Sequence, residues 1–395
     1  REVPFMGVIW VVHEASKLGF TNGHPDWCNL GQGQPEVGAM PGAPPRIESV
    51  RLIPEDHAYG PLGGLPELRE AVAKHYNRLF RKGRKSLYTA ANVCVAQGGR
   101  LALSRAFAAL DKGRVGHQLP DYTAYEDLFN LHLGRLRSVA VRTRERDGFA
   151  LTPAGFSKAV SQGKLRAFVL SNPCNPTGTV IRGRDLAALV RTAREKRCTL
   201  LLDEFYSHFV YGGGGPVSAS AFVEDVEKDP VVLFDGLTKG YRYPGWRIGW
   251  AIGPSAMVEA MARTASAMDG GPSRIAQRAA LQALEPRRAD RETDALRRVF
   301  ARKRDLTVAS LSRMGVRFAA EPVSTFYAWG CLDGLPPAFR DSMAFLRAAL
   351  DRKVLTVPGE FFDVNPGKRR KGVWPYRNWM PFSYGPPEAH AGMGL

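Results

Sequence analysis

Short apolar runs alternate with longer amphipathic stretches in the middle of the chain. The runs LRAFVLS (165–171), CTLLLD (198–203) and PVVLFD (230–235) have the length and aliphatic content of buried strands. Between the first two runs, residues 182–197 carry apolar side chains at helical spacing. This alternation predicts βαβ units and a mostly parallel sheet. Each run ends in a polar turn, and ligands of open α/β sheets gather at such carboxyl ends.

The N-terminal run FMGVIWVV (5–12) is apolar but only eight residues long. No apolar run reaches the roughly 18 residues that a membrane span needs. The N-terminal run also lacks the basic lead and the small-residue cleavage site of a signal peptide. We therefore expect a packed or partner-clasping N-terminal arm, and no membrane partner.

The composition limits the class of protein to which the chain can belong, but it does not indicate a reaction. The 395 residues, 44% hydrophobic and 24% charged, are typical of a soluble globular protein of two domains. Five widely spaced cysteines without a CxxC pair indicate reduced thiols in a cytoplasmic protein, and no cluster has metal-ligand spacing. The net charge of +17 suits a nucleic-acid binder, but the basic residues are spread along the chain among acidic ones, so we expect no nucleic-acid partner.

The segment DGLTKGYRYPGWRIGW (235–250) places Lys239 just after an apolar run and Arg247 eight residues later. A lysine that forms a Schiff base needs a flexible stem and a free amine. A phosphate nearby needs a fixed guanidinium and hydroxyl or N–H donors. For an isolated lysine and arginine, a solvated loop is the usual interpretation. Other segments favour a cofactor site instead.

Two further turns follow the first two apolar runs. SNPCNPTG (171–178) holds two Asn-Pro pairs, which fix a rigid path and point the asparagine side chains inward. The second run ends at Asp203, and a carboxylate at the end of a buried strand needs a cation or strong donors. A structural salt bridge meets that need, and so does a protonated pyridine nitrogen. Together with Asn175 and Lys239, the pattern favours the pyridine.

These segments resemble the class I/II aminotransferases, which are fold-type I enzymes dependent on pyridoxal 5'-phosphate (PLP). The resemblance rests on ordered motifs: NLGQGQP (29–35), YGPLGGLPELREAV (59–72), VAQGGRLAL (95–103), PDYTAY (120–125), SNPCNPTG, DEFY, TK, GWRIG, PVSTFYAW (322–329) and PYRNWMPFSYG (375–385). It implies an α/β fold with a large PLP-binding domain, whose mostly parallel sheet is sandwiched by helices, and a smaller α+β domain. The expected boundaries are an arm with part of the small domain at 1–57, the large domain at 58–290 and the C-terminal small domain at 291–395.

The resemblance also gives roles to residues around the cofactor ring. Lys239 would bind PLP as a Schiff base and, once released by substrate, act as the general base. Asp203 would pair with the pyridine N–H and keep the ring an electron sink. Tyr206 and Asn175 would hydrogen-bond the phenolic oxygen, and Tyr122 would stack on the ring.

Further roles concern the phosphate and the substrate. The backbone N–H groups of Gly99 and Arg100 would bind phosphate at a helix N-terminus, and Thr238 and Arg247 would complete the cup. Tyr59 would reach the phosphate of the neighbouring subunit's cofactor, which implies a homodimer with active sites at its interface.

The substrate α-carboxylate is assigned to a third group of residues. Arg377 would clamp it as a bidentate pair, and Asn175 and the Gly33 backbone would assist.

The chain departs from the family pattern at three places. Gly236 stands where many members carry a phosphate-binding serine, and Ser324 replaces a usual glycine. The insert FFDVNPGKRRKG (361–372) is unusually basic, and its run 368–371 is either a solvated loop or a site for an anionic ligand. These departures leave the reaction type open.

We expect transfer of an amino group from an α-amino acid to a 2-oxo acid. The alternative is PLP-dependent γ-elimination or replacement in specialised metabolism, on S-adenosylmethionine or a similar amino acid, with an anionic nucleotide co-substrate held by the basic insert. A PLP-binding regulatory domain is a third interpretation, which the intact lysine and arginine positions disfavour.

Overall fold

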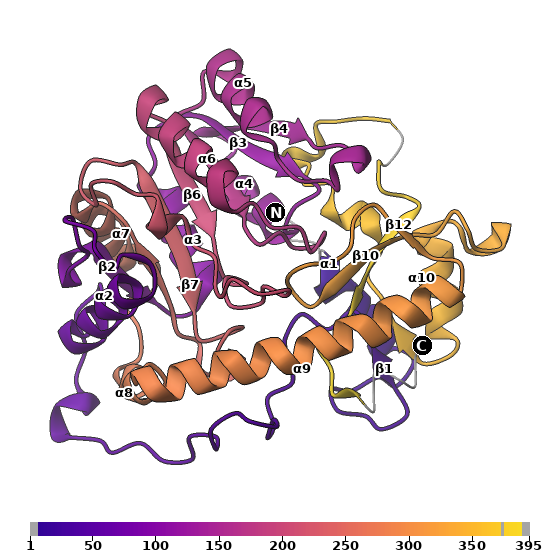
Figure 1. Cartoon of the computed structure of the whole chain (residues 1–395), viewed down its shortest axis with the longest axis horizontal. Coiled ribbons are helices and arrows are strands. Elements are labelled where there is room, and N and C mark those ends of the chain that lie inside the picture. The colour runs from indigo at the N-terminus through magenta and orange to yellow at the C-terminus, as the bar shows by residue number, and fades with distance from the viewer. Residues whose placement is uncertain (1–6, 373–374, 389–395) are drawn as a thin grey trace.

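The computed structural model describes residues 7–372 and 375–388. Residues 1–6 and 389–395, the ends of the expected first and last segments, and residues 373–374 lie outside this description. Figure 1 shows a large sheet covered by helices on one side of the molecule and a smaller body on the other, with one long helix running beneath both.

Seven strands form the large sheet in the order β2-β8-β7-β6-β5-β3-β4. They are β2 (Val93–Ala96), β3 (Gly113–Leu119), β4 (Leu136–Arg142), β5 (Ala167–Ser171), β6 (Thr199–Asp203), β7 (Val231–Gly236) and β8 (Gly249–Ile252). The strand pairs from β7 to β4 are all parallel, whereas β8 runs antiparallel to both of its neighbours. The sheet is thus mostly parallel, as predicted.

The three apolar runs form adjacent strands of this sheet. They are β5, β6 and β7, each within two residues of its predicted bounds, and the predicted helix between the first two is α6 (Gly183–Lys196). Because neighbouring parallel strands end at the same edge, the turns after these strands come together.

Helices cover both faces of the large sheet. One face packs against α2 (Pro66–Phe80), α5 (Pro153–Gly163), α6 and α8 (Arg274–Ala283), and the other against α3 (Gly99–Ala109), α4 (Ala124–Leu131) and α7 (Ser255–Met268). The strand residues alternate accordingly: Leu200 and Leu202 of β6 join the first core cluster, and Leu201 joins the second. A strand buried on both faces reads as a continuous apolar run, which explains the pattern in the sequence.

The smaller body is built around an antiparallel sheet in the order β12-β10-β9. Its elements are β9 (Arg317–Phe318), β10 (Tyr327–Cys331), α10 (Ser342–Leu350), β11 (Val354–Leu355) and β12 (Trp379–Ser383), and α9 (Pro286–Arg313) leads into it. The N-terminal part of the chain returns here, because β1 (Cys28–Asn29) pairs with β11 and α1 (Gly7–Ser16) packs against α10. The described part of the N-terminal arm, from Gly7 onwards, is therefore packed against the smaller body. The domain boundaries remain a prediction.

Candidate active site

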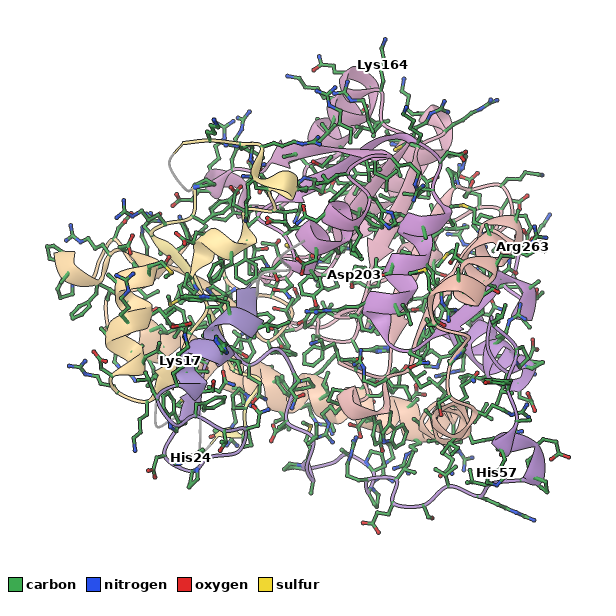
Figure 2. All side chains as sticks on the ribbon, turned by 180° about the vertical axis from the view of Figure 1, so that it is seen from behind. Lys17, His24, His57, Lys164, Asp203 and Arg263 are labelled. Atoms are coloured by element: carbon green, nitrogen blue, oxygen red, sulfur yellow. The ribbon has the colours of Figure 1, made fainter. Side chains whose placement is uncertain are left out.

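A cavity of about 480 Å³ lies at the carboxyl ends of the parallel strands. Loops after β3, β5, β6 and β7 contribute to its wall, together with α1, the loop after β1 and β12. In Figure 2, Asp203 lies in the interior between the two bodies, while the other labelled side chains lie towards the periphery. The cavity therefore gathers residues from both bodies around the strand ends that the sequence singled out.

Lys239 follows β7 and lines the cavity. Its amine donates a hydrogen bond to the carbonyl oxygen of Gly33 and lies 5.6 Å from the ring centre of Tyr206. Burial lowers the pKa of the Lys239 amine to about 7, Asp203 acts to raise it, and Arg100 and Arg247 lower it further. A large share of the amine is therefore neutral at physiological pH, as a nucleophile requires.

Asp203 ends β6 and is buried beneath the cavity floor. The Tyr125 hydroxyl donates to Oδ2 at 3.1 Å, and the Phe205 N–H lies 3.4 Å from Oδ1. Burial raises the pKa of the Asp203 carboxyl to about 6, against these two donors and the charge of Lys239. Among the described residues Asp203 has no ion pair, so a cation in the cavity would supply what the carboxylate lacks.

One polar atom of the cavity wall is unsatisfied, and a second has a single neighbour. The Asn175 side-chain oxygen is buried without a hydrogen-bond partner within the described part of the chain, and the buried Tyr206 hydroxyl has the Tyr327 hydroxyl beside it. Buried polar atoms normally find a partner, so the Asn175 side chain marks a place for a polar ligand group. Asn175 and Tyr206 both belong to segments that the sequence assigned to the phenolic oxygen.

One end of the cavity suits a phosphate. α3 begins at Gly99, and a Cβ atom on Gly98 would lie 2.3 Å from Nη2 of Arg247, so this guanidinium stands directly against the turn. Thr238 and Arg100 line the same cavity. A helix N-terminus beside a guanidinium and a hydroxyl is a favourable setting for an anion.

Tyr122 lines the cavity beside Arg100. The Arg100 Nε donates to the Tyr122 hydroxyl at 3.1 Å, and its guanidinium carbon lies 5.8 Å from the ring centre. The Tyr122 ring meets Tyr125 edge-on at 5.6 Å. These contacts hold the ring at the cavity wall, and stacking on a cofactor remains a prediction.

Two predicted residues lie away from the cavity. The Arg377 side chain is 64% exposed and pairs with Asp341, which caps α10, so the structure differs from the expected carboxylate clamp. The reason is local: Arg377 precedes β12 in a turn that faces α10. Tyr59 is 98% exposed and does not line this chain's cavity, and its contact with a neighbouring subunit remains a prediction.

The structure explains two of the three departures from the family pattern, Gly236 and Ser324. A Cβ atom on Gly236 would lie 2.5 Å from the Ile248 carbonyl oxygen, which leaves no room for a serine. Ser324 is buried, and its hydroxyl donates to the Gly178 carbonyl at 2.9 Å, so it joins the small body to the turn that carries Asn175.

The basic insert has acidic partners within the chain. Lys368 pairs with Glu126 at 2.6 Å and Arg370 with Asp363 at 2.6 Å. None of the four residues of the run 368–371 is among the described residues that line the cavity. Two of the four cations are thus balanced without an anionic co-substrate.

Several cavity residues were not singled out from the sequence. Tyr125 contacts Asp203. Four others line the cavity wall: Gln34, Tyr327 and the α1 residues Val8 and Ile9. Tyr125 and Tyr327 stand inside motifs that were recognised, but nothing in those motifs distinguishes them. The apolar character of α1 indicated packing and gave no sign of a cavity wall.

The residues fit PLP on their chemistry. A buried carboxylate without an ion pair matches a pyridinium, the Tyr206 hydroxyl and the amide group of Asn175 are donors that match a phenolic oxygen, and the Gly98–Arg247 end matches a phosphate. Lys239 stands in the same cavity as a partly neutral amine. No group of three metal-ligating side chains occurs within residues 7–372 and 375–388.

Comparison with known proteins shows which sequences resemble this chain. The family model described as aminotransferase class I and II matches residues 25–373. The chain is 33% identical over 307 residues to an aspartate/prephenate aminotransferase of Thermus thermophilus, covering 77% of this chain and 76% of the relative. It is 29% identical over 348 residues to an aspartate aminotransferase of Bacillus subtilis, covering 86% and 85%.

Solved structures give the same result for the fold. An aspartate aminotransferase from Thermus thermophilus with maleate superimposes with a TM-score of 0.80 at 27% identity, covering 99% of this chain and 95% of that one. An aromatic aminotransferase from Pyrococcus horikoshii superimposes with a TM-score of 0.77 at 25% identity, covering 97% and 96%.

Proposed function

This chain belongs to the class I and II aminotransferases and depends on PLP, and we propose that it takes the amino group from an acidic α-amino acid and gives it to a 2-oxo acid. The observation that carries the proposal is the pairing, in one cavity, of a partly neutral lysine and a buried carboxylate without a cation. When bound, PLP supplies an electron-withdrawing ring that stabilises negative charge at the substrate Cα. The remaining chemistry belongs to the residues of the chain.

We propose that Lys239 has two roles in this cavity. Its amine holds the cofactor covalently between turnovers and, once free, moves the proton of the substrate Cα. The Asp203 carboxylate holds a proton on the ring nitrogen, because a buried anion stabilises an adjacent cation. Asn175 and Tyr206 bind the ring oxygen, and Tyr122 bounds the ring.

The phosphate end has its own set of residues. In this proposal the phosphate is bound by the N–H groups of Gly99 and Arg100, the Thr238 hydroxyl and the Arg247 guanidinium. Gly33 and Asn175 face the substrate. This division gives the Arg100 side chain, which is bonded to Tyr122 and faces Asp127, no role in holding the cofactor.

The preference for an acidic substrate rests on Arg100. Among the described residues, three cationic side chains line the cavity: Arg100, Lys239 and Arg247. Lys239 is committed to the cofactor and Arg247 to the phosphate, so Arg100 is the cation left for a substrate carboxylate. The Thermus and Bacillus relatives are named for aspartate, which agrees with this choice.

We propose that the chain acts as a homodimer. Several large apolar side chains near Tyr59 and the start of α8 are exposed: Leu52, Ile53, Tyr59, Met268 and Ile275. A second copy covering this face would bury them and bring Tyr59 towards the neighbouring cavity.

A cytoplasmic location is proposed on the cysteines. All five cysteines are buried. Nowhere in the described part of the chain is a helix long and apolar enough to cross a membrane.

The elimination and replacement alternative receives no support. The relatives named above are aminotransferases, and the basic insert finds acidic partners in its own chain.

The test is a half-reaction with the PLP-loaded protein. Aspartate, glutamate and neutral amino acids are added one at a time without an acceptor, and conversion to the pyridoxamine form is followed by absorbance. We expect rapid conversion with the acidic amino acids and reversal on addition of their 2-oxo acids. Release of ammonia without the pyridoxamine form would contradict transamination. Equal rates with neutral amino acids would contradict only the acidic preference.

A further inference from the structure

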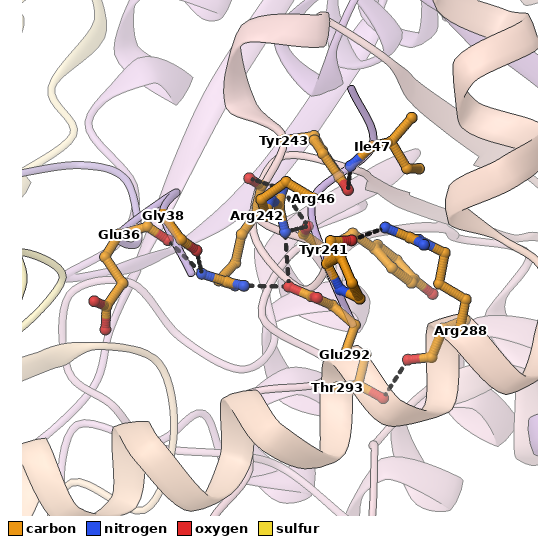
Figure 3. Close-up of polar contacts among 12 residues, drawn as sticks. Glu36, Gly38, Arg46, Ile47, Tyr241, Arg242, Tyr243, Arg288, Glu292 and Thr293 are labelled. Atoms are coloured by element: carbon orange, nitrogen blue, oxygen red, sulfur yellow. Dashed lines mark hydrogen bonds and ion pairs between the residues drawn. The ribbon is translucent and has the colours of Figure 1, made fainter. Parts of the chain in front are cut away.

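The loop that carries Lys239 is tied to α9 through three buried or largely buried charged side chains, Arg46, Arg242 and Glu292 (Figure 3). The Arg242 Nε donates to Oε1 of Glu292 at 2.6 Å, and the Arg46 Nη1 donates to the same oxygen at 3.1 Å. Two guanidinium groups on one carboxylate leave a net positive charge. Such a cluster needs further acceptors inside the protein.

Backbone carbonyl groups supply several of those acceptors, although the Arg242 Nη2 has no hydrogen-bond partner among the described residues. The Arg242 Nη1 donates to the Gly38 and Glu36 carbonyls at 2.8 and 3.2 Å, and the Arg46 Nη2 donates to the Arg242 carbonyl at 2.7 Å. These bonds join three parts of the chain that are far apart in sequence: the segment 36–46, the loop after Lys239 and the helix α9 (Figure 3).

Arg242 has an unusual backbone for its residue type. Its φ is +57°, in the left-handed region that favours glycine, and its N–H donates to the Lys239 carbonyl at 3.1 Å. An arginine at such a position gains nothing from its backbone preference. The contacts of the guanidinium offset this backbone cost.

The same helix also holds the segment that leads to the cavity wall. Lys303 of α9, three turns beyond Glu292 on the same face, binds the Glu36 carboxylate at 3.1 Å. Three residues before Glu36, the Gly33 carbonyl accepts the hydrogen bond of the Lys239 amine. The helix α9 therefore holds both the loop that carries Lys239 and the segment that carries Gly33 in the cavity wall.

We propose that Arg242, with Arg46 and Glu292, is a positioning residue that sets where the Lys239 amine stands relative to Asp203 and Gly33. This inference rests on the proposed role of Lys239. The Arg242 guanidinium is directed to Glu292 and to backbone carbonyls, and no contact joins it to the Lys239 amine among the described residues. A changed titration of Lys239 in an Arg242 variant therefore reports a moved amine rather than a lost neighbouring charge.

The experiment compares Arg242→Met with Arg194→Met. Arg242→Met leaves Glu292 paired with Arg46, so it is the least disruptive change in the cluster. Arg194 of α6 forms a two-point ion pair with the buried Asp229, which precedes β7, and Arg194→Met breaks this pair. Arg194 does not line the cavity. It is therefore a matched control for lost stability.

Two readouts are used. In the cofactor-free protein, the pH dependence of Lys239 modification by an amine reagent, followed by peptide mass spectrometry, gives the midpoint of its titration. In the PLP-loaded protein, kcat and KM for aspartate are measured. We expect Arg242→Met to shift the midpoint by about half a pH unit or more. Its kcat should fall on the order of ten-fold, with KM little changed, because a misplaced catalytic group slows chemistry more than binding.

The control should lower the melting temperature and move neither readout. A folded Arg242→Met with the wild-type midpoint and kcat would overturn the proposal and leave a purely structural ion pair. If Arg242→Met does not fold, Arg242→Lys replaces it, since an ammonium reaches Glu292 but lacks the planar fork that also holds the carbonyls. Wild-type values in that variant would overturn the proposal equally. If the proposed role of Lys239 is itself wrong, the Lys239→Ala variant will keep turnover. That result is separate from the outcome for Arg242.

Discussion

The Tyr125 hydroxyl donates a 3.1 Å hydrogen bond to Oδ2 of Asp203, at the end of the β6 strand. The Phe205 N–H approaches the other oxygen, so both oxygens of the carboxylate are oriented before any ligand binds. Neither donor carries a charge. The carboxylate is therefore fixed in place while its need for a cation is left unmet, which is the arrangement expected of a preorganised cofactor partner.

The variant Asp203→Asn tests whether the negative charge at this position is needed, because it keeps the shape of the side chain. The amide keeps the size of the side chain but removes the anion that holds a proton on the ring nitrogen. We expect kcat to fall on the order of 1,000-fold, as for the loss of a preorganised charge-stabilising group, while cofactor still binds. Tyr125→Phe is the matched control and should cost far less, since it leaves the anion. Near-normal turnover in Asp203→Asn would reject the proposed role.

The same variant should be more stable than the wild type without cofactor. The folded pKa of Asp203 is about 6, above its ordinary value of 3.8, so the folded state binds more protons in that interval and stability falls as pH rises through it. At pH 8 the buried anion therefore destabilises the cofactor-free protein by on the order of 1–3 kcal/mol. Thermal unfolding should show that Asp203→Asn is more stable than the wild type above pH 6. Below pH 4 the two proteins should have nearly the same stability. A variant that is less stable at pH 8 would contradict this account.

Lys239 should be the most reactive lysine of the cofactor-free protein near neutral pH. Burial lowers the pKa of its amine to about 7, whereas an ordinary lysine has 10.5. Modification with an amine reagent across pH 6–9 should show half-maximal reactivity at Lys239 near pH 7. Bound PLP should protect it, and Lys239→Ala should remove both the visible absorbance of the lysine-bound cofactor and turnover while the fold remains. A midpoint near 10 would show that the amine is solvated.

Arg100 and Arg377 are competing candidates for the substrate carboxylate. Arg100 lines the cavity, whereas Arg377 is paired with Asp341 outside it. We expect Arg100→Gln to cost about 2 kcal/mol or more in binding an acidic substrate, which raises KM for aspartate roughly 30-fold, with PLP retained. Arg377→Gln should change KM little. The reverse result would restore the carboxylate clamp first expected at Arg377.

The strands and their turns were the most predictable part of the molecule. β5, β6 and β7 are buried on both faces, so they read as continuous apolar runs, and the residues after them must meet at one edge. Asp203, Asn175 and Lys239 could be placed together for this reason.

Other positions depend on contacts that no local pattern encodes. Arg377 was expected to face the substrate because of its place in a motif, but its orientation is decided by Asp341 on α10. Arg242 sits within the recognised lysine segment, yet its importance appears only when Glu292 and Gly38 are brought to it by the fold. Long-range ion pairs of this kind join residues separated by tens or hundreds of positions, so sequence spacing gives no signal for them.

Gly98→Ala should weaken cofactor binding without unfolding the protein. Gly98 precedes α3 with φ +85°, a conformation that L side chains rarely adopt, and an added Cβ would lie 2.3 Å from Nη2 of Arg247. The strain in the backbone costs on the order of 1 kcal/mol, and the guanidinium must move away from the phosphate end of the cavity. PLP affinity, measured by absorbance or fluorescence titration, should fall while the far-UV circular dichroism stays unchanged. Gly83→Ala is a useful control, because Gly83 also has a positive φ but meets no atom within 4 Å, so it carries the strain without the displacement. Equal PLP affinity in the two variants would show that the approach of Arg247 to this turn does not serve the phosphate.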